Sequence, residues 1–457
     1  MSATGETGRP PASRGTAVAI ASLALFGFAL ELRAFWPGLM STDSIEQYTQ
    51  AALARYNDHH PPIMALLWSW TNRVVTGPGG MLTVHLALLW AGLWAIAEAA
   101  RRSGLRHAWA IVPIGVLPWI ASIAGVIWKD VGMAYALLCA GGLVALAETS
   151  GRRLRIATIA GALVLIAYAT MVRANGAFAA LALAVYAAAT ALPRASRARI
   201  VASGAIFVAL VLGGQQLLER RLLDASPRHL SQLVMLFDLA GIACRGGEVD
   251  IPAAFQAPSY DRAALCRAYD PDQVDTLLFF PAHPLEQSFD RRDVAKLRQA
   301  WIAAALAHPQ LYLAHRAYSF AGLLGLHSVP EHYRYLRQPY MQPNPWGFAF
   351  TPNAFSSAFD ASVDALAGSG LFNGTFWIAV ASILLVLIAI LRLAARLETA
   401  LLASGLMNAL PYFFFSLAPN YRFLYWTVLA TTAALALLVL KIGAFARREA
   451  HRGLAPA

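Results

Sequence analysis

Long apolar runs recur along the whole chain and are separated by short polar connections. A helix needs about 20 largely apolar residues to cross a hydrocarbon core about 30 Å thick. Windows of this kind predict about ten membrane-spanning helices. They cover Ala17–Met40, Met81–Ala99, Ala108–Ile127, Val131–Leu146, Ile156–Val172, Ala177–Leu192, Ile200–Leu217, Leu371–Leu393, Thr399–Leu417 and Phe423–Leu440. The pattern therefore predicts an all-α polytopic membrane protein.

The composition supports this interpretation. Hydrophobic residues make up 58% of the 457 residues and charged residues only 13%, whereas a soluble domain carries about 25% charged residues. The excess of apolar side chains requires a lipid bilayer to cover it. The first apolar run follows Arg14 and ends without a small-residue cleavage site, so we expect an uncleaved signal anchor.

The net charge of +11 is distributed unevenly between the connections. Positive residues mark cytoplasmic loops, and here they gather in every second connection. The basic connections hold Arg9 and Arg14; Arg101, Arg102 and Arg106; Arg152, Arg153 and Arg155; Arg194, Arg197 and Arg199; Arg392 and Arg396; and Lys441, Arg447, Arg448 and Arg452. This distribution predicts a multi-pass membrane protein with both termini cytoplasmic. It explains the positive charge without a nucleic-acid partner.

The predicted spans divide the chain into three parts. Residues 1–217 form an N-terminal transmembrane core, 218–370 a mixed extracytoplasmic region between spans seven and eight, and 371–457 the C-terminal helices and tail. Pro61–Val75 starts with two prolines and contains two tryptophans, which favours an interfacial helix after span one. Trp301–His327 is apolar but interrupted at His308-Pro309 and His315-Arg316, which also favours interfacial helices.

Two of the three cysteines lie in the predicted extracytoplasmic region. An oxidising compartment permits Cys244 and Cys266 to form a disulfide, while two separate buried thiols are the alternative. Cys139 lies inside a predicted span.

Ionisable residues crowd the first predicted outer loop. Asp43 and Glu46 come first, and Asp58, His59 and His60 follow just before the two prolines. Helix capping explains part of this pattern, because Asp43 and Glu46 have capping-box spacing and Asp58 precedes a helix start. Capping does not require the second carboxylate or the paired histidines.

Further charges lie at the outer ends of later spans. Lys129 and Asp130 form the second outer loop, and they either serve a site or neutralise each other at two helix ends. Arg173 and Arg422 oppose the prevailing charge bias. A guanidinium group binds phosphate in bidentate geometry, so a phosphate-bearing lipid is one candidate ligand, and pairing with Asp43, Asp58 or Asp130 is the alternative.

These residues together resemble a known group of enzymes. Seven short motifs are similar to motifs of the GT-C superfamily of polytopic glycosyltransferases. They are Asp43, Gln47-Tyr48, Asp58-His59-His60-Pro61-Pro62, Lys129-Asp130, Arg173-Ala174-Asn175-Gly176, His308-Pro309-Gln310-Leu311-Tyr312 and Asn420-Tyr421-Arg422-Phe423-Leu424-Tyr425. The likeness is greatest to bacterial members related to the rhizobial lipopolysaccharide and aminoarabinose transferases. It implies inverting transfer of a sugar from a polyprenyl-phosphate donor to an envelope acceptor, either glycan, lipid or protein, at the periplasmic face of the cell inner membrane.

The resemblance also implies roles for individual residues. Asp43 would be the catalytic carboxylate, and a divalent cation, Mg²⁺ or Mn²⁺, could be held by Asp43 and Asp130. The implied substrate-binding residues are Asp58, His59, His60, Lys129, Asp130, Arg173, Asn175, Tyr421 and Arg422. The chain departs from many relatives by having Ser44 after Asp43 and Asn420 in the late motif.

Two other functions compete with glycosyl transfer. A transporter or flippase would use similar charges along a pathway near the bilayer midplane, usually between related halves of the chain. The predicted charges lie at one face instead, and no internal repeat is visible. An acyltransferase or phosphotransferase would use the His59-His60 pair as a base, but it would leave Asp43 and the outer arginines without a clear role.

Overall fold

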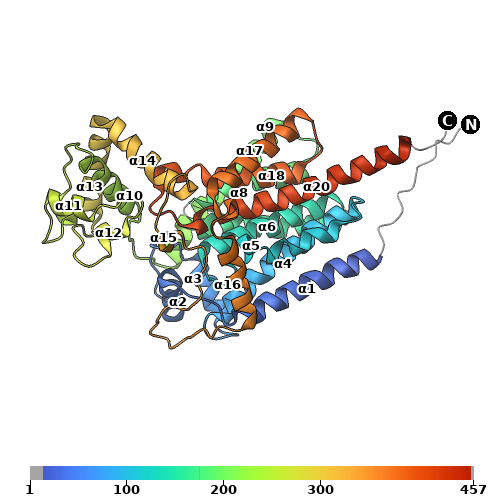
Figure 1. The fold of residues 1–457 in the computed structure, drawn as a ribbon, viewed down its shortest axis with the longest axis horizontal. Coiled ribbons are helices and arrows are strands. Elements are labelled where there is room, and N and C mark those ends of the chain that lie inside the picture. The colour runs from blue at the N-terminus through green and yellow to red at the C-terminus, as the bar shows by residue number, and fades with distance from the viewer. Residues whose placement is uncertain (1–13, 174, 454–457) are drawn as a thin grey trace, which may run out of the picture.

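The computed structural model describes residues 14–173 and 175–453. Arg9, one of the predicted cytoplasmic residues, lies outside these ranges. Within them the chain forms helices and isolated β-bridges but no strand. Figure 1 shows a long bundle of helices with a smaller helical unit at one end. Helix α1 begins and helix α20 ends at the opposite end of the bundle.

Six helical segments of the described chain are long and apolar enough to cross a membrane. They are α1 (Arg14–Phe35), α4 (Gly79–Arg102), α6 (Lys129–Glu148), α7 (Arg152–Val172), Arg197–Leu222, which comprises α9 (Arg197–Leu217) and its π-helical end η2 (Leu218–Leu222), and Tyr421–Ala446, which covers η5 (Tyr421–Leu424) and most of α20 (Tyr425–Gly453). Helix α6 lies at the centre of the bundle, because 94% of its apolar window is buried.

The peripheral helices expose apolar side chains along their length. Only 11% of the apolar window of Arg197–Leu222 is buried, and Ile206 and Leu210 on α9 are 58% and 69% exposed. A contiguous apolar face of this kind is covered by lipid rather than water. These helices therefore indicate association with a membrane.

The prediction of about ten spans is not confirmed. Three of the predicted spans are shorter helices, namely α8 (Gly176–Ala191), α17 (Gly374–Ile390) and α18 (Arg396–Ala409). The last of these predicted spans also contains the short helix α19 (Tyr412–Phe415), which follows α18. Hydropathy detects these apolar runs but does not locate the capping residues and prolines, such as Asn373 and Pro411, at which helices begin or end.

The predicted span Ala108–Ile127 is not one continuous helix. It forms the 3₁₀ helix η1 (Ala108–Val116) and the four-residue helix α5 (Pro118–Ala121). Proline lacks the N–H group that an α-helix interior needs, and Pro113 and Pro118 interrupt the run. Irregular backbone is tolerated at membrane depth where protein covers it, and the stretch from Ile120 to Trp128 is buried.

Short helices follow α1 at the end of the bundle that carries the smaller unit. These are α2 (Thr42–Leu53) and α3 (Ile63–Thr71), the latter within the predicted interfacial segment. Helix α16 (Ala354–Leu366) lies across the bundle beside α1 (Figure 1). The segment that precedes α16 contacts α2. There Trp346 donates a hydrogen bond from Nε1 to the Thr49 hydroxyl at 3.1 Å.

The smaller unit has an apolar core of its own. It contains α10 (Ser231–Ala243), η3 (Ala253–Phe255), α11 (Arg262–Ala268), α12 (Asp275–Leu278) and α13 (Arg291–Ala307), and we call it the α10–α13 unit. A disulfide joins Cys244 to Cys266, whose Cα atoms are 5.3 Å apart. Cys139 is a buried free thiol in α6.

Helix α14 (Pro309–Leu324) connects this unit to the bundle, and α15 (Glu331–Arg334) and η4 (Gly370–Phe372) follow it. The chain breaks at His308-Pro309 as predicted, but His315 and Arg316 do not interrupt α14. Both are fully buried beside Asp238 of α10, and Arg316 Nε lies 2.5 Å from Asp238 Oδ1. Arg316 also donates to the Ser416 carbonyl at 2.9 Å. Arg316 thus links Asp238 of the α10–α13 unit to the C-terminal part of the chain.

We predict that Asp238→Ala destabilises the protein strongly. Arg316 would remain buried without its carboxylate, at a cost on the order of 3–5 kcal/mol. Asp364→Ala is the matched control, since Asp364 pairs with Arg337 at the surface and its side chain is 53% exposed. We expect that control to cost less than about 1 kcal/mol. Thermal unfolding of the purified protein in detergent would measure both, and equal midpoints for the two variants would refute the structural role of Asp238.

Candidate functional site

Ionisable side chains from distant parts of the sequence meet at the end of the bundle near the α10–α13 unit. We call this group the charged cluster and define it as Asp43, Glu46, His60, Lys129, Asp130, Arg173 and Arg422. Its members come from α2, the loop before α3, the start of α6, the residue after α7, and η5. The structure therefore brings together most of the predicted site residues.

The local structure of α2 places Asp43 beside α6. Ser41 and Ser44 form the capping box of α2, so the predicted Asp43–Glu46 capping box does not form, and both carboxylates are available for other contacts. The Ser44 hydroxyl donates to the Ile127 carbonyl at 2.8 Å, and Trp128 Nε1 donates to the Ser41 hydroxyl at 2.7 Å. These bonds tie the start of α2 to the residues that precede α6.

Asp43 forms an ion pair with Arg422, whose Nη1 lies 2.7 Å from Asp43 Oδ2. The guanidinium stacks over the Trp128 ring at 4.8 Å, and its buried Nε has no hydrogen-bond partner among the described residues. Burial raises the pKa of the Asp43 carboxyl, but neighbouring positive charges, above all Arg422, hold that pKa well below its usual range. Asp43 is thus an ionised carboxylate, and its side chain remains 30% exposed.

His60 connects Asp43 to Lys129. Its Nδ1 lies 2.6 Å from Lys129 Nζ, and its Nε2 lies 3.7 Å from Glu46 Oε2 and 4.0 Å from Asp43 Oδ1. Burial and the Lys129 charge lower the pKa of His60 well below its usual range, so the imidazole is neutral near pH 7. Lys129 therefore contacts His60, and the alternative of a self-neutralising Lys129–Asp130 pair does not describe this structure.

Asp130 pairs with Arg173, and both side chains are almost completely buried. Arg173 Nε also donates to Asn175 Oδ1 at 2.7 Å, and its guanidinium lies 5.0 Å from the Phe423 ring centroid. The two outer arginines are thus paired within the protein, as the alternative interpretation of the sequence proposed. Asp43 and Asp130 each bind an arginine, and the Asp43–Asp130 metal site stays a prediction.

Two predicted substrate-binding residues make other contacts. Asp58 accepts a hydrogen bond from the Arg228 backbone N–H and so orders the connection after η2, instead of capping α3. Tyr421 is buried and donates to the Trp119 carbonyl at 2.6 Å. These bonds give both residues a structural role.

Two residues of the predicted extracytoplasmic region lie near the charged cluster and were not predicted. Burial raises the pKa of Asp275 in α12, the Asp43 charge raises it further, and Arg422 lowers it. The Tyr335 ring lies 6.4 Å from the Trp128 ring on which Arg422 stacks. No local motif marks either residue, so only the tertiary structure reveals them.

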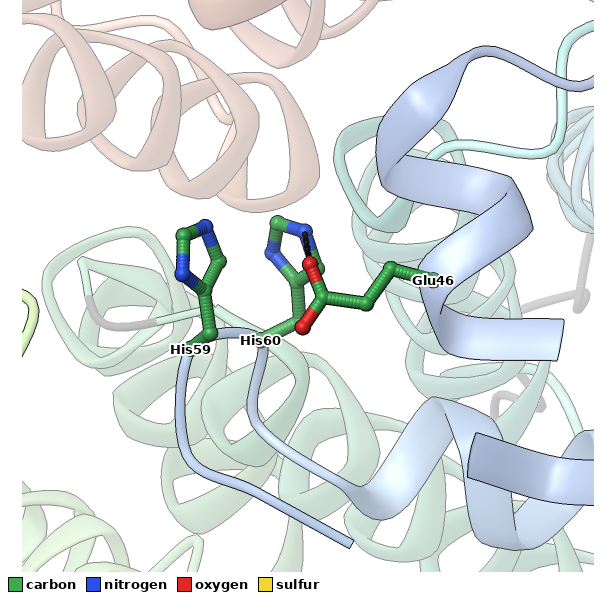
Figure 2. A group of neighbouring side chains, drawn as sticks. All are labelled: Glu46, His59 and His60. Atoms are coloured by element: carbon green, nitrogen blue, oxygen red, sulfur yellow. Dashed lines mark ion pairs between the residues drawn. The ribbon is translucent and has the colours of Figure 1, made fainter. Parts of the chain in front are cut away.

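One group in the described chain has the composition of a metal site. Glu46, His59 and His60 each offer one ligand atom, and these atoms lie within 4.8 Å of one another. Figure 2 shows the two imidazole rings side by side, with Glu46 reaching from α2 toward His60. Glu46 was not among the predicted ligands, although its presence in the same loop as the histidines was visible in the sequence.

Comparisons of the chain with protein-family models, curated proteins and solved structures found no match. A functional proposal therefore draws on the geometry of the charged cluster and on the motifs of the sequence.

We predict that Arg173→Ala destabilises the protein and that adding Asp130→Asn recovers part of the loss. Arg173→Ala leaves the Asp130 carboxylate buried without a counter-charge, whereas the neutral amide of the double variant removes that charge. Truncation of a buried pair costs about 3–5 kcal/mol. Thermal unfolding of the two single variants and the double variant would measure the coupling. Purely additive losses would show that the two side chains do not act as a pair.

Proposed function

We propose that this protein is a membrane glycosyltransferase that moves a sugar from a polyprenyl-phosphate donor to an envelope acceptor. The observation that carries the proposal is the ionised, partly exposed Asp43 carboxylate, which pairs with Arg422 and is connected to Lys129 through His60, at one end of the bundle. A carboxylate suits the removal of a proton from an attacking hydroxyl. Cations suit the stabilisation of a departing phosphate.

The proposed reaction is a single displacement at the sugar. The acceptor hydroxyl oxygen attacks the anomeric carbon, and its proton passes to Asp43. The bond between the anomeric carbon and the phosphate oxygen breaks at the same time, and polyprenyl phosphate leaves with the bonding electrons. Attack from the face opposite the phosphate inverts the anomeric configuration. Arg422 and Lys129 are the cations closest to Asp43 through direct or His60-mediated contacts.

The Asp43–Arg422 pair suggests how donor binding would prepare the base. A carboxylate whose pKa lies far below its usual range is a weak base. A donor phosphate that draws Arg422 away would weaken this pairing and raise the pKa of Asp43 toward its ordinary value. The guanidinium has capacity for such a ligand, since its Nε lacks a partner among the described residues.

The resemblance to the GT-C superfamily supports the same proposal, as does the position of the charged cluster. The basic connections of the sequence favour cytoplasmic termini. Because α1 begins and α20 ends at the end of the bundle away from the α10–α13 unit (Figure 1), the charged cluster would face the periplasm from the inner membrane. Lipid-linked sugars could reach it there from the outer leaflet.

We predict that Asp43→Asn lowers glycosyl transfer by about 10²–10⁴-fold, the usual contribution of a general base. The asparagine amide is nearly isosteric but does not accept the proton. Mass spectrometry of lipids and surface glycans would compare deletion cells complemented with wild-type or variant protein. Asp364→Asn, a surface carboxylate away from the charged cluster, is the control and should leave the product unchanged. Wild-type product levels in the Asp43→Asn cells would exclude Asp43 as the base.

We further predict that Arg422→Lys raises the KM for the lipid-phosphate donor about tenfold and leaves the KM for the acceptor unchanged. Lysine keeps the charge but loses the planar fork that grips phosphate and stacks on Trp128. Initial rates with each substrate varied in turn would separate the two constants. Arg337→Lys, at a surface ion pair, is the matched control. A selective rise in the acceptor KM would contradict the donor-binding role of Arg422.

A further inference from the structure

We propose that Glu46, His59 and His60 bind one divalent transition-metal ion of the zinc type. Two imidazole nitrogens and one carboxylate oxygen form a donor set that holds catalytic zinc and leaves one coordination position open. This donor set differs from the all-oxygen Asp43–Asp130 pair expected from the sequence. The proposal concerns metal binding alone and does not depend on the proposed glycosyl transfer.

The arrangement needs only a small contraction to surround an ion. The three ligand atoms lie within 4.8 Å of one another. Ligands about 2.1 Å from a tetrahedral ion are about 3.4 Å apart. His59 is partly exposed, and its ring contacts the His60 ring with centroids 4.6 Å apart. Rotation of the His59 and Glu46 side chains would close the remaining gap.

The state of His60 is an independent indication of a ligand. His60 is only 4% exposed, and its Nε2 has no hydrogen-bond partner among the described residues. The dashed line in Figure 2 joins this nitrogen to the Glu46 carboxylate at 3.7 Å. That distance is too long for a hydrogen bond. An ion between the two atoms would satisfy a buried nitrogen that otherwise lacks a partner.

A supporting shell already orients the ligands. Asn57 donates from Nδ2 to Glu46 Oε1 at 3.1 Å, which leaves Oε2 directed at His60. The His59 backbone N–H donates to Asn57 Oδ1 at 3.0 Å, and Gln50 Nε2 donates to the same oxygen at 3.2 Å. Hydrogen bonds of this kind fix ligand orientation in protein metal sites.

Lys129 and Asp43 lie next to the proposed ion site. Lys129 Nζ lies 2.6 Å from His60 Nδ1, the ring nitrogen that does not face Glu46. Asp43 Oδ1 lies 4.0 Å from His60 Nε2, so the open position of the ion would adjoin the Asp43–Arg422 pair.

The test uses full-length protein purified in detergent with a tag that contains no histidine. After treatment with chelator, the protein is titrated with ZnCl₂ by calorimetry, and its metal content is measured by mass spectrometry after gel filtration. We expect one zinc ion per chain, and an equal concentration of MgCl₂ should not displace it. His59→Ala and Glu46→Gln should each weaken zinc binding at least tenfold. His332→Ala, which removes an exposed histidine outside this group, should have no effect.

A second measurement separates loss of the site from loss of the fold. Zinc should raise the thermal unfolding temperature of the wild-type protein and of His332→Ala, but not that of His59→Ala. Without zinc, His59→Ala should unfold at the wild-type temperature. Failure of the wild-type protein to bind zinc, or unchanged binding by His59→Ala, would overturn the proposal. Both measurements are made without substrate, so either result leaves the transferase proposal to be judged separately.

Discussion

Two ion pairs, Asp130 with Arg173 and Asp43 with Arg422, determine how the helix ends meet at the charged cluster. A charge at the edge of an apolar bundle is costly unless an opposite charge accompanies it. Satisfying both pairs requires α2, α6, the residue after α7 and η5 to converge. The Phe423 ring lies close to both guanidinium groups, at 5.0 Å from Arg173 and 5.4 Å from Arg422. The same constraint therefore builds the site and fixes the packing around it.

The segment from Ser416 to Arg422 connects this site to the α10–α13 unit. The Ser416 carbonyl accepts from Arg316, the Leu417 carbonyl accepts from the Val274 N–H at 3.0 Å, and Arg422 binds Asp43. Val274 immediately precedes Asp275, whose pKa responds to the Asp43 charge. A movement of the α10–α13 unit would thus shift the segment that carries Arg422 in the charged cluster. In the proposed transferase, this connection would place the α10–α13 unit where it can influence acceptor selection.

The sequence predicts the parts of this structure that depend on local composition. Helices such as α4 and α6 follow from apolar length, and Arg173 and Arg422 stand out because they oppose the charge bias. Hydropathy fails around Pro113, where the run is as apolar as a span but its backbone is not α-helical. The sequence offers pairing of these arginines with distant carboxylates as one alternative, but it does not reveal which carboxylate each arginine binds, nor that Asp275 approaches Asp43. Those contacts depend on tertiary packing, which no local pattern encodes.

The most direct test of the central claim follows the chemical fate of the lipid-linked donor. Purified protein would be reconstituted into liposomes that contain polyprenyl-phosphate sugars and envelope acceptors extracted from the host membrane. Mass spectrometry would then monitor the lipids. The account predicts that polyprenyl phosphate appears as its glycosylated form disappears, with an equal amount of sugar joined to an acceptor. Movement of an intact donor between leaflets, without release of polyprenyl phosphate, would contradict it and favour a flippase.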